Sequence, residues 1–145
     1  MILYNEIEKS IRNHDAILHF DGDVSKSDIR HAIRWVMRNN PDIFWFTHQY
    51  YFDSESGTVS LKYQFSKERS SSIQMSIDDV LINDFQIDYV RTLGIMEKVA
   101  YVYKWLLTYC NYNVNSAYNQ NIDSVFVRRN SVCTGYAKAA QYLFK

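Results

Sequence analysis

A cysteine at the predicted start of the last helix is the residue of this chain best suited to covalent chemistry. Residues 132–144 carry apolar side chains at helical spacing, and Cys133 lies near the beginning of that segment. Backbone N–H groups are unpaired at a helix N-terminus and the helix dipole is positive there, so both effects favour a thiolate. A thiolate is the form of cysteine that attacks a carbonyl carbon. Cys133 is therefore a candidate nucleophile, and the alternative is a buried, inert cysteine capping a core helix.

The residues around Cys133 form a motif. Residues 130–137 read Asn-Ser-Val-Cys-Thr-Gly-Tyr-Ala, and Gly135 within them has no side chain, so another segment or a substrate can approach closely. The motif resembles the nucleophile motif of the transglutaminase-like cysteine enzymes of bacteria. The preceding segments are also similar to that family, and they comprise a helix over Lys98–Leu107, the run Asn111-Tyr112-Asn113 and a loop with Ser116-Ala117-Tyr118. The resemblance covers residues 76–145 and does not extend to residues 1–70.

The resemblance implies an α+β fold in which residues 73–145 form the helical half of a papain-like or transglutaminase-like core. It also implies thiol-dependent peptide hydrolysis or amide acyl transfer on a protein or peptide substrate, with no cofactor. The family places a His and an Asp of a Cys-His-Asp triad after the cysteine, whereas all four histidines of this chain precede Cys133. We therefore expect a truncated or partial transglutaminase-like protein in which Cys133 is the one catalytic residue. The alternative is a non-catalytic binding or assembly module on the same scaffold.

The histidines and acidic pairs have simpler interpretations. His48 lies in an aromatic strand, where alternation either aims it at a cleft or leaves it on a solvent-facing hairpin position. His14, His19 and His31 lack the spacing and the cysteine partners of a zinc site, so no metal is expected. The run 21–23, Asp-Gly-Asp, is similar to the start of a calcium loop, but the remaining ligands are missing, which favours a polar turn.

Two charged pairs lie closer to the motif. Arg128 and Arg129 either meet an acidic substrate or partner or form a solvated loop. Asp78 and Asp79 are expected at a helix start, where the helix dipole favours carboxylates.

Residues 1–72 are expected to form a small α/β region. A helix is predicted over residues 2–13 from the spacing of Leu3, Ile7 and Ile11. A short strand is predicted over residues 16–20. Ser25 or Ser27 is expected to cap a second helix that ends near Pro41. Its predicted inner face is Ile29, Ala32, Ile33, Val36 and Met37. The aromatic run 43–53, the turn 54–57 and the alternating run 58–65 predict a β-hairpin. The polar run 66–72 is expected to be an internal boundary or a strand-to-helix loop.

Residues 73–145 are expected to be mainly helical. One helix is predicted from about residue 77, with Val80, Leu81, Phe85 and Tyr89 on one face, and a second has Ile95, Val99, Val102, Leu106 and Tyr109 along one side. Residues 111–121 are expected to be a loop. The last helix is predicted over residues 132–144, with Ala137, Ala140 and Leu143 on a shared face.

Composition limits the classes of protein to which this chain can belong. Sixteen basic residues balance sixteen acidic ones, so no net charge draws the chain of 145 residues to nucleic acid or anionic lipid. Two cysteines are too few for a disulfide scaffold, and neither a signal peptide nor a membrane span is recognisable, which fits a cytoplasmic protein or a processed secreted fragment. Without the family's downstream strands, Tyr136, Ala140, Leu143 and Phe144 would be partly bare, which predicts a homodimer through the C-terminal helix.

Overall fold

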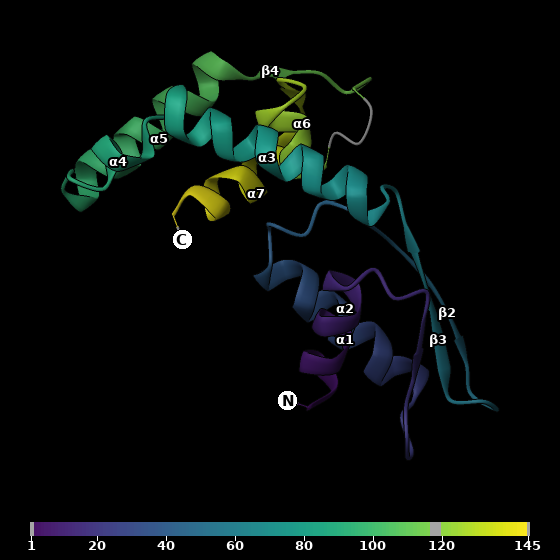
Figure 1. Ribbon diagram of the computed structural model, residues 1–145. Helices are drawn as coiled ribbons and strands as arrows, with labels where there is room; N and C mark the ends of the chain where they lie inside the picture. Colours follow the sequence, from purple (N-terminus) through teal and green to yellow (C-terminus); the bar gives the residue numbers. More distant parts are fainter. Residues whose placement is uncertain (1, 117–119, 145) are drawn as a thin grey trace. The chain divides into compact units, whose positions relative to one another are not determined.

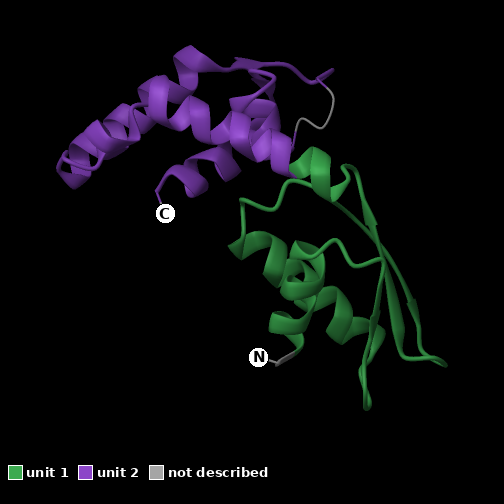
Figure 2. Ribbon diagram, in the orientation of Figure 1, with its two compact units in different colours: residues 1–70 green, residues 71–145 purple. Residues whose placement is uncertain are grey.

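The computed structural model describes residues 2–116 and 120–144 and confirms the α+β class (Figure 1). The chain divides into two compact units, residues 1–70 and 71–145, which Figure 2 distinguishes by colour. Each unit is described by itself below. The loop residues Ala117 and Tyr118, which belong to the family resemblance, lie outside the described residues.

Unit 1 packs two helices on a three-stranded antiparallel sheet (Figure 1). The helices are α1 (Ile2–Arg12) and α2 (Lys26–Asn39), and the strand order is β1 (Ile17–His19), β3 (Thr58–Tyr63), β2 (Phe46–Asp53). Apolar side chains spaced three or four residues apart on both helices meet alternate residues of the strands. The shared core comprises Ile7, Ile11, Ile29, Ala32, Ile33, Val36, Met37, Phe46, Val59 and Leu61, and the helical part of it was predicted from the spacing.

Local signals set the element boundaries in unit 1. Ser25 caps α2 through a capping box with Asp28, and the helix ends at Asn39, just before Pro41. The hairpin turn requires Gly57, whose φ is +67° and where a Cβ atom would lie 2.9 Å from the carbonyl oxygen of Phe20. The hairpin and both helices agree with the sequence-based prediction.

The polar run 66–72 is not a loop, so that part of the prediction is wrong. Helix α3 (Lys67–Asn83) begins there, because the Ser66 hydroxyl accepts a hydrogen bond from the Arg69 N–H at 3.1 Å and caps the first turn. The Ser70 hydroxyl donates to the Ser66 carbonyl at 2.8 Å, so this serine is satisfied inside a helix. Asp78 and Asp79 consequently lie in the middle of α3, not at a helix start, and they accept hydrogen bonds from Gln74 and Asn83.

Unit 2 contains most of α3 and four further helices, with a short parallel strand pair. The helices are α4 (Ile87–Val90), α5 (Ile95–Tyr109), α6 (Ile122–Phe126) and α7 (Cys133–Leu143), and the pair is β4 (Asn111–Tyr112) with β5 (Asn130–Ser131). Neither α6 nor the strand pair was predicted, because two- and five-residue elements are too short to show a periodicity.

Two predicted helix faces in unit 2 are wrong in part. Phe85 is buried as predicted, but Tyr89 is exposed and lies on the separate helix α4. In α5 the buried residues are Val102, Trp105 and Leu106, whereas Ile95 is 80% exposed at the first helical position. The buried face of α5 is rotated from the predicted one toward Trp105, which packs edge-on against Phe85 with the ring centres 5.1 Å apart.

Candidate functional site

Cys133 is the first residue of α7, as the motif predicts. The preceding residue, Val132, is the N-cap, with an extended backbone (φ −117°, ψ 179°). The first intrahelical hydrogen bond runs from the Tyr136 N–H to the Val132 carbonyl, so the N–H groups before Tyr136 precede the helical ladder. The Cys133 side chain is exposed, whereas Cys110 is buried. The thiol of Cys133 is therefore accessible to a substrate, which a core cysteine would not be.

Helix α7 is held to its unit by a face different from the predicted one. Gly135 and Ala139 are the buried residues, and α7 packs against α5, α6 and β5. Ala137 is exposed, so the predicted face of Ala137, Ala140 and Leu143 is not the inner one. A glycine and an alanine at the contact let the helix approach its neighbours closely, and this pins the first turn that carries Cys133.

Tyr136 anchors that first turn to the end of α5. Its hydroxyl donates a 2.6 Å hydrogen bond to the backbone carbonyl of Cys110, and its ring lies parallel to that of Tyr112 in β4 at 6.4 Å. Burial is the main cause that raises the pKa of Tyr136, so the phenol stays protonated and remains a donor. The Gly-Tyr part of the motif thus positions the first turn of α7, which carries Cys133.

Replacement of Tyr136 tests this anchor. We expect Tyr136→Phe to lower the free energy of unfolding by about 1–2 kcal/mol, because the Cys110 carbonyl loses its donor in a partly buried place. Urea denaturation followed by circular dichroism measures the change. Tyr112→Phe is the matched control, since Tyr112 is 63% exposed. Equal stability of both variants and the wild type would show that the hydrogen bond does not hold α7.

A buried polar group that the sequence did not reveal lies next to the start of α7. It consists of Asn121, Asp123 and Ser124 from the start of α6 and Ser131 from β5, all no more than 8% exposed. The Ser124 hydroxyl donates to the Asn121 carbonyl at 2.7 Å and lies 2.7 Å from the Ser131 hydroxyl. Ser131 directly precedes the N-cap of α7, so these bonds fix where the helix begins. The one available signal was Asn121 as a possible N-cap followed by Asp123 in the first turn.

Asp123 is the most unusual member of this group. Its side chain is 2% exposed, and its Oδ2 lies 3.8 Å from Nε of Arg128. Its Oδ1 has no hydrogen-bond partner among the described residues. Burial raises the pKa of Asp123 to about 6, and the Arg128 charge opposes this effect. Asp123 is therefore a buried carboxyl group that titrates in the physiological range.

The two arginines make contacts within their own unit. Arg128 faces Asp123 as described. Arg129 donates from Nε to the Tyr109 carbonyl at 2.9 Å, and its guanidinium lies 4.4 Å from the centre of the Tyr109 ring. Arg129 has a φ of +59°, a backbone conformation that these contacts maintain. Arg129 thus tethers the loop before β5 to the end of α5, whereas Arg128 faces α6. Both arginines are exposed in this loop, which agrees with the solvated-loop alternative.

None of the histidines belongs to the unit that carries Cys133. His48 is exposed at a bulge of β2 with a φ of +66°, which agrees with the solvent-facing alternative. His14 stacks on Trp45 and Tyr63, and its Nε2 lies 3.1 Å from the Ser70 hydroxyl. Burial lowers the pKa of His14, so the neutral ring is favoured, in keeping with a packing role.

Cys133 does not line either of two pockets that the described residues form. A pocket of about 350 Å³ in unit 2 is lined by the far end of α7, including Leu143 and Phe144, and by residues of α4 and α5. The helix rises about 1.5 Å per residue, so this pocket lies about 15 Å from Cys133. A second hollow, of about 500 Å³, is lined by His14, Tyr63 and neighbours in unit 1.

Searches for a metal cluster and for a membrane-spanning helix concern the described part of the chain alone. Within residues 2–116 and 120–144, no group of three His, Cys, Asp or Glu side chains could hold a metal ion. Asp21 and Asp23 flank an exposed bend at Gly22, as the polar-turn interpretation predicts. None of the described helices combines the length and apolarity needed to cross a membrane.

No model of a known protein family matches the chain, and no curated protein matches it significantly.

Proposed function

We propose that Cys133 is the acyl-accepting nucleophile of a transglutaminase-like thiol enzyme, and that this chain supplies the nucleophile-bearing part of its core. The observation that supports this most strongly is an exposed thiol on the first residue of an anchored helix. The motif 130–137 supports it further, because its glycine and tyrosine seat the helix while the cysteine stays accessible.

The proposed chemistry begins with attack of the Cys133 thiolate on a carboxamide or peptide carbonyl. A C–S bond forms as the carbonyl becomes a tetrahedral oxyanion, and its collapse to a thioester expels the amine. An amine leaves only when it is protonated, and the general acid that would supply the proton is a histidine in the resembled family. Residues 134–145 contain no histidine. We therefore expect amide substrates to react negligibly with the isolated chain, since loss of triad members costs several orders of magnitude in rate.

An activated ester tests the attack by the Cys133 thiolate without the need to protonate a leaving group. p-Nitrophenyl acetate releases a phenolate that needs no protonation, so we expect a burst of one equivalent followed by very slow turnover. The burst should be faster than the reaction of an equal concentration of N-acetylcysteine, retained in Cys110→Ala and lost in Cys133→Ala. Peptide and glutamine substrates should show no turnover. A burst that persists in Cys133→Ala would refute the nucleophile assignment.

The second candidate is a non-catalytic binding or assembly module on the same scaffold. It is favoured by the lack of any histidine after Cys133 in this sequence. It predicts acylation of Cys133 no faster than that of the free thiol. Turnover of an amide substrate that Cys133→Ala abolishes would contradict this module, and it would indicate that an upstream histidine or a second chain supplies the base.

A further inference from the structure

Helix α5 carries apolar side chains on two faces, and only one of these faces is buried among the described residues of unit 2. The inner face carries Val102, Trp105 and Leu106. Met96, Tyr103 and Leu107 are 81%, 58% and 74% exposed. With the exposed Ala100 they recur at spacings of four, three and four residues, which places all four along one line of the helix. We call these four residues the outer stripe.

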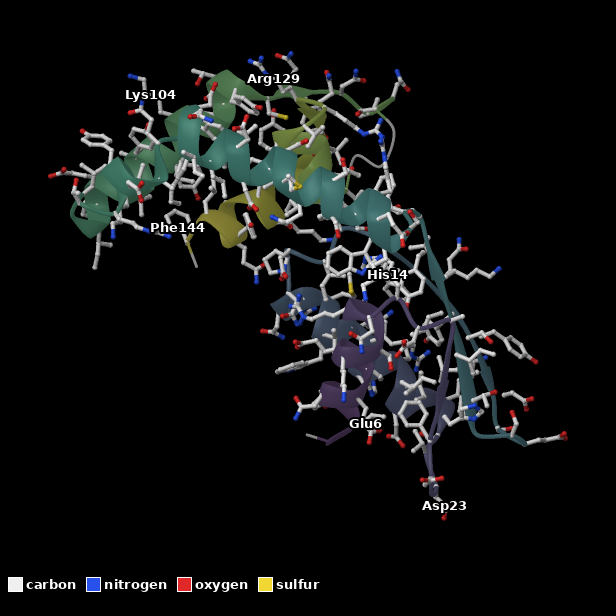
Figure 3. All side chains as sticks on the ribbon, viewed as in Figure 1. Glu6, His14, Asp23, Lys104, Arg129 and Phe144 are labelled. Carbon is white, nitrogen blue, oxygen red and sulfur yellow. The ribbon has the colours of Figure 1, made fainter. Side chains whose placement is uncertain are left out.

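Two exposed charges flank the outer stripe on one edge. Glu97 and Lys104 are seven residues apart, or two helical turns, so they lie above one another at the same side of the stripe. Figure 3 shows Lys104 projecting outward from α5. The stripe thus has one acidic position near its N-terminal end and one basic position nearer its C-terminal end.

We propose that the outer stripe binds the same stripe of a second copy of this chain, with the two α5 helices antiparallel. The centre of the stripe lies between residues 101 and 102. A two-fold axis through that point sets Met96 opposite Leu107 of the second copy and Ala100 opposite its Tyr103. The small side chain therefore faces a large ring, and the longer apolar chains face one another.

The charges favour this orientation. The same two-fold axis keeps the charged edges of both helices on one side and brings Glu97 close to Lys104 of the second copy, twice per dimer. A parallel two-fold pairing would instead put the charged edges of the two helices on opposite sides of the contact, so Glu97 and Lys104 would not pair across it. A surface that is complementary to itself in both apolar pattern and charge suits a second copy better than an unrelated partner.

The stripe offers a few hundred Å² per copy, less than the roughly 800 Å² per partner of a standard interface. We therefore expect a weak dimer that dissociates in the micromolar range or above.

This pairing differs from the homodimer through the C-terminal helix that the sequence suggested. In α7, Tyr136, Ala140 and Leu143 are half-buried, and of the four predicted patch residues only Phe144 is exposed. The two surfaces can be separated by one exposed substitution in each, Leu107→Glu in α5 and Phe144→Glu at the end of α7.

Sedimentation equilibrium of the full chain from micromolar to millimolar concentration tests the proposal. We expect a monomer–dimer equilibrium that Leu107→Glu abolishes and Phe144→Glu leaves unchanged. Tyr103→Ser is a second variant of the stripe and should also weaken the dimer. Because these side chains are exposed, the circular dichroism of each variant should match that of the wild type.

Charge reversal tests the antiparallel register. Glu97→Lys and Lys104→Glu should each raise the dissociation constant about tenfold, and the double reversal should restore it. A monomer at every concentration would overturn the proposal, as would a dimer that survives Leu107→Glu. Loss of the dimer with Phe144→Glu alone would place the interface on α7. Failure of the double reversal to restore binding would rule out the antiparallel register.

Discussion

A small alkylating reagent is expected to modify Cys133 at least about a hundredfold faster than Cys110. Cys133 is exposed at a helix N-terminus, whereas Cys110 is 3% exposed at the C-cap of α5. Burial is the main cause that raises the pKa of Cys110, so its thiolate is scarce as well as shielded. A reagent reaches Cys110 only when the end of α5 opens. The observed rate of modification of Cys110 is therefore the rate for an exposed thiol multiplied by the small fraction of molecules that are open.

Iodoacetamide at mildly acidic pH measures this difference. Samples quenched at intervals and digested give the labelled fraction of each cysteine by mass spectrometry. Cys110→Ala should keep the fast phase of the wild type, and Cys133→Ala should retain only the slow one. Addition of urea above the unfolding transition should bring the two rates together, which tests whether folding causes the selectivity. Comparable labelling of both cysteines in the native protein would remove the basis for treating Cys133 as the nucleophile.

The sequence predicted the elements whose signals are local and long. Helix α2 has a capping serine, apolar residues that recur every three or four positions over its fourteen residues, and a proline just after its end. The hairpin has alternating apolar and polar residues on both sides of a glycine turn. The same reasoning failed where polar residues take part in a helix. Serines near the start of α3 bond to nearby backbone groups, which no apolar period records, so the helix was predicted to begin about ten residues too late.

The candidate site was predictable only at its cysteine. The motif predicted the position of Cys133 at the start of α7, since a helix start has a local signature. The residues that hold this start are distant in sequence or lie in very short elements. Tyr136 reaches the Cys110 carbonyl across 26 positions, and Ser124 meets Ser131 across a turn that joins α6 to β5. Such contacts depend on the packing of α5, α6 and α7, which one sequence does not encode as a periodic pattern.

The carboxyl group of Asp123 is expected to make the protein less stable as the pH rises from about 4 to about 6. Its pKa is about 6 in the folded chain against 3.8 for the unperturbed group. The unfolded state therefore ionises first, and folding binds a proton between these two values. The contribution of Asp123 to the free energy of unfolding is highest below about pH 4 and falls until Asp123 is ionised in both states. The difference of about two pKa units corresponds to roughly 3 kcal/mol.

Asp123→Asn should remove this dependence, because an amide of similar shape does not titrate. We take the free energy of unfolding of the variant minus that of the wild type. This difference should be about 3 kcal/mol larger at about pH 7.5 than at about pH 4. Urea denaturation at a series of pH values measures both curves, and the other acidic groups cancel in the difference. Asp88→Asn is the matched control, since Asp88 also faces an arginine, Arg91 at 3.4 Å, but on the exposed surface. Parallel curves for Asp123→Asn and the wild type would show that the carboxyl group is not buried as described.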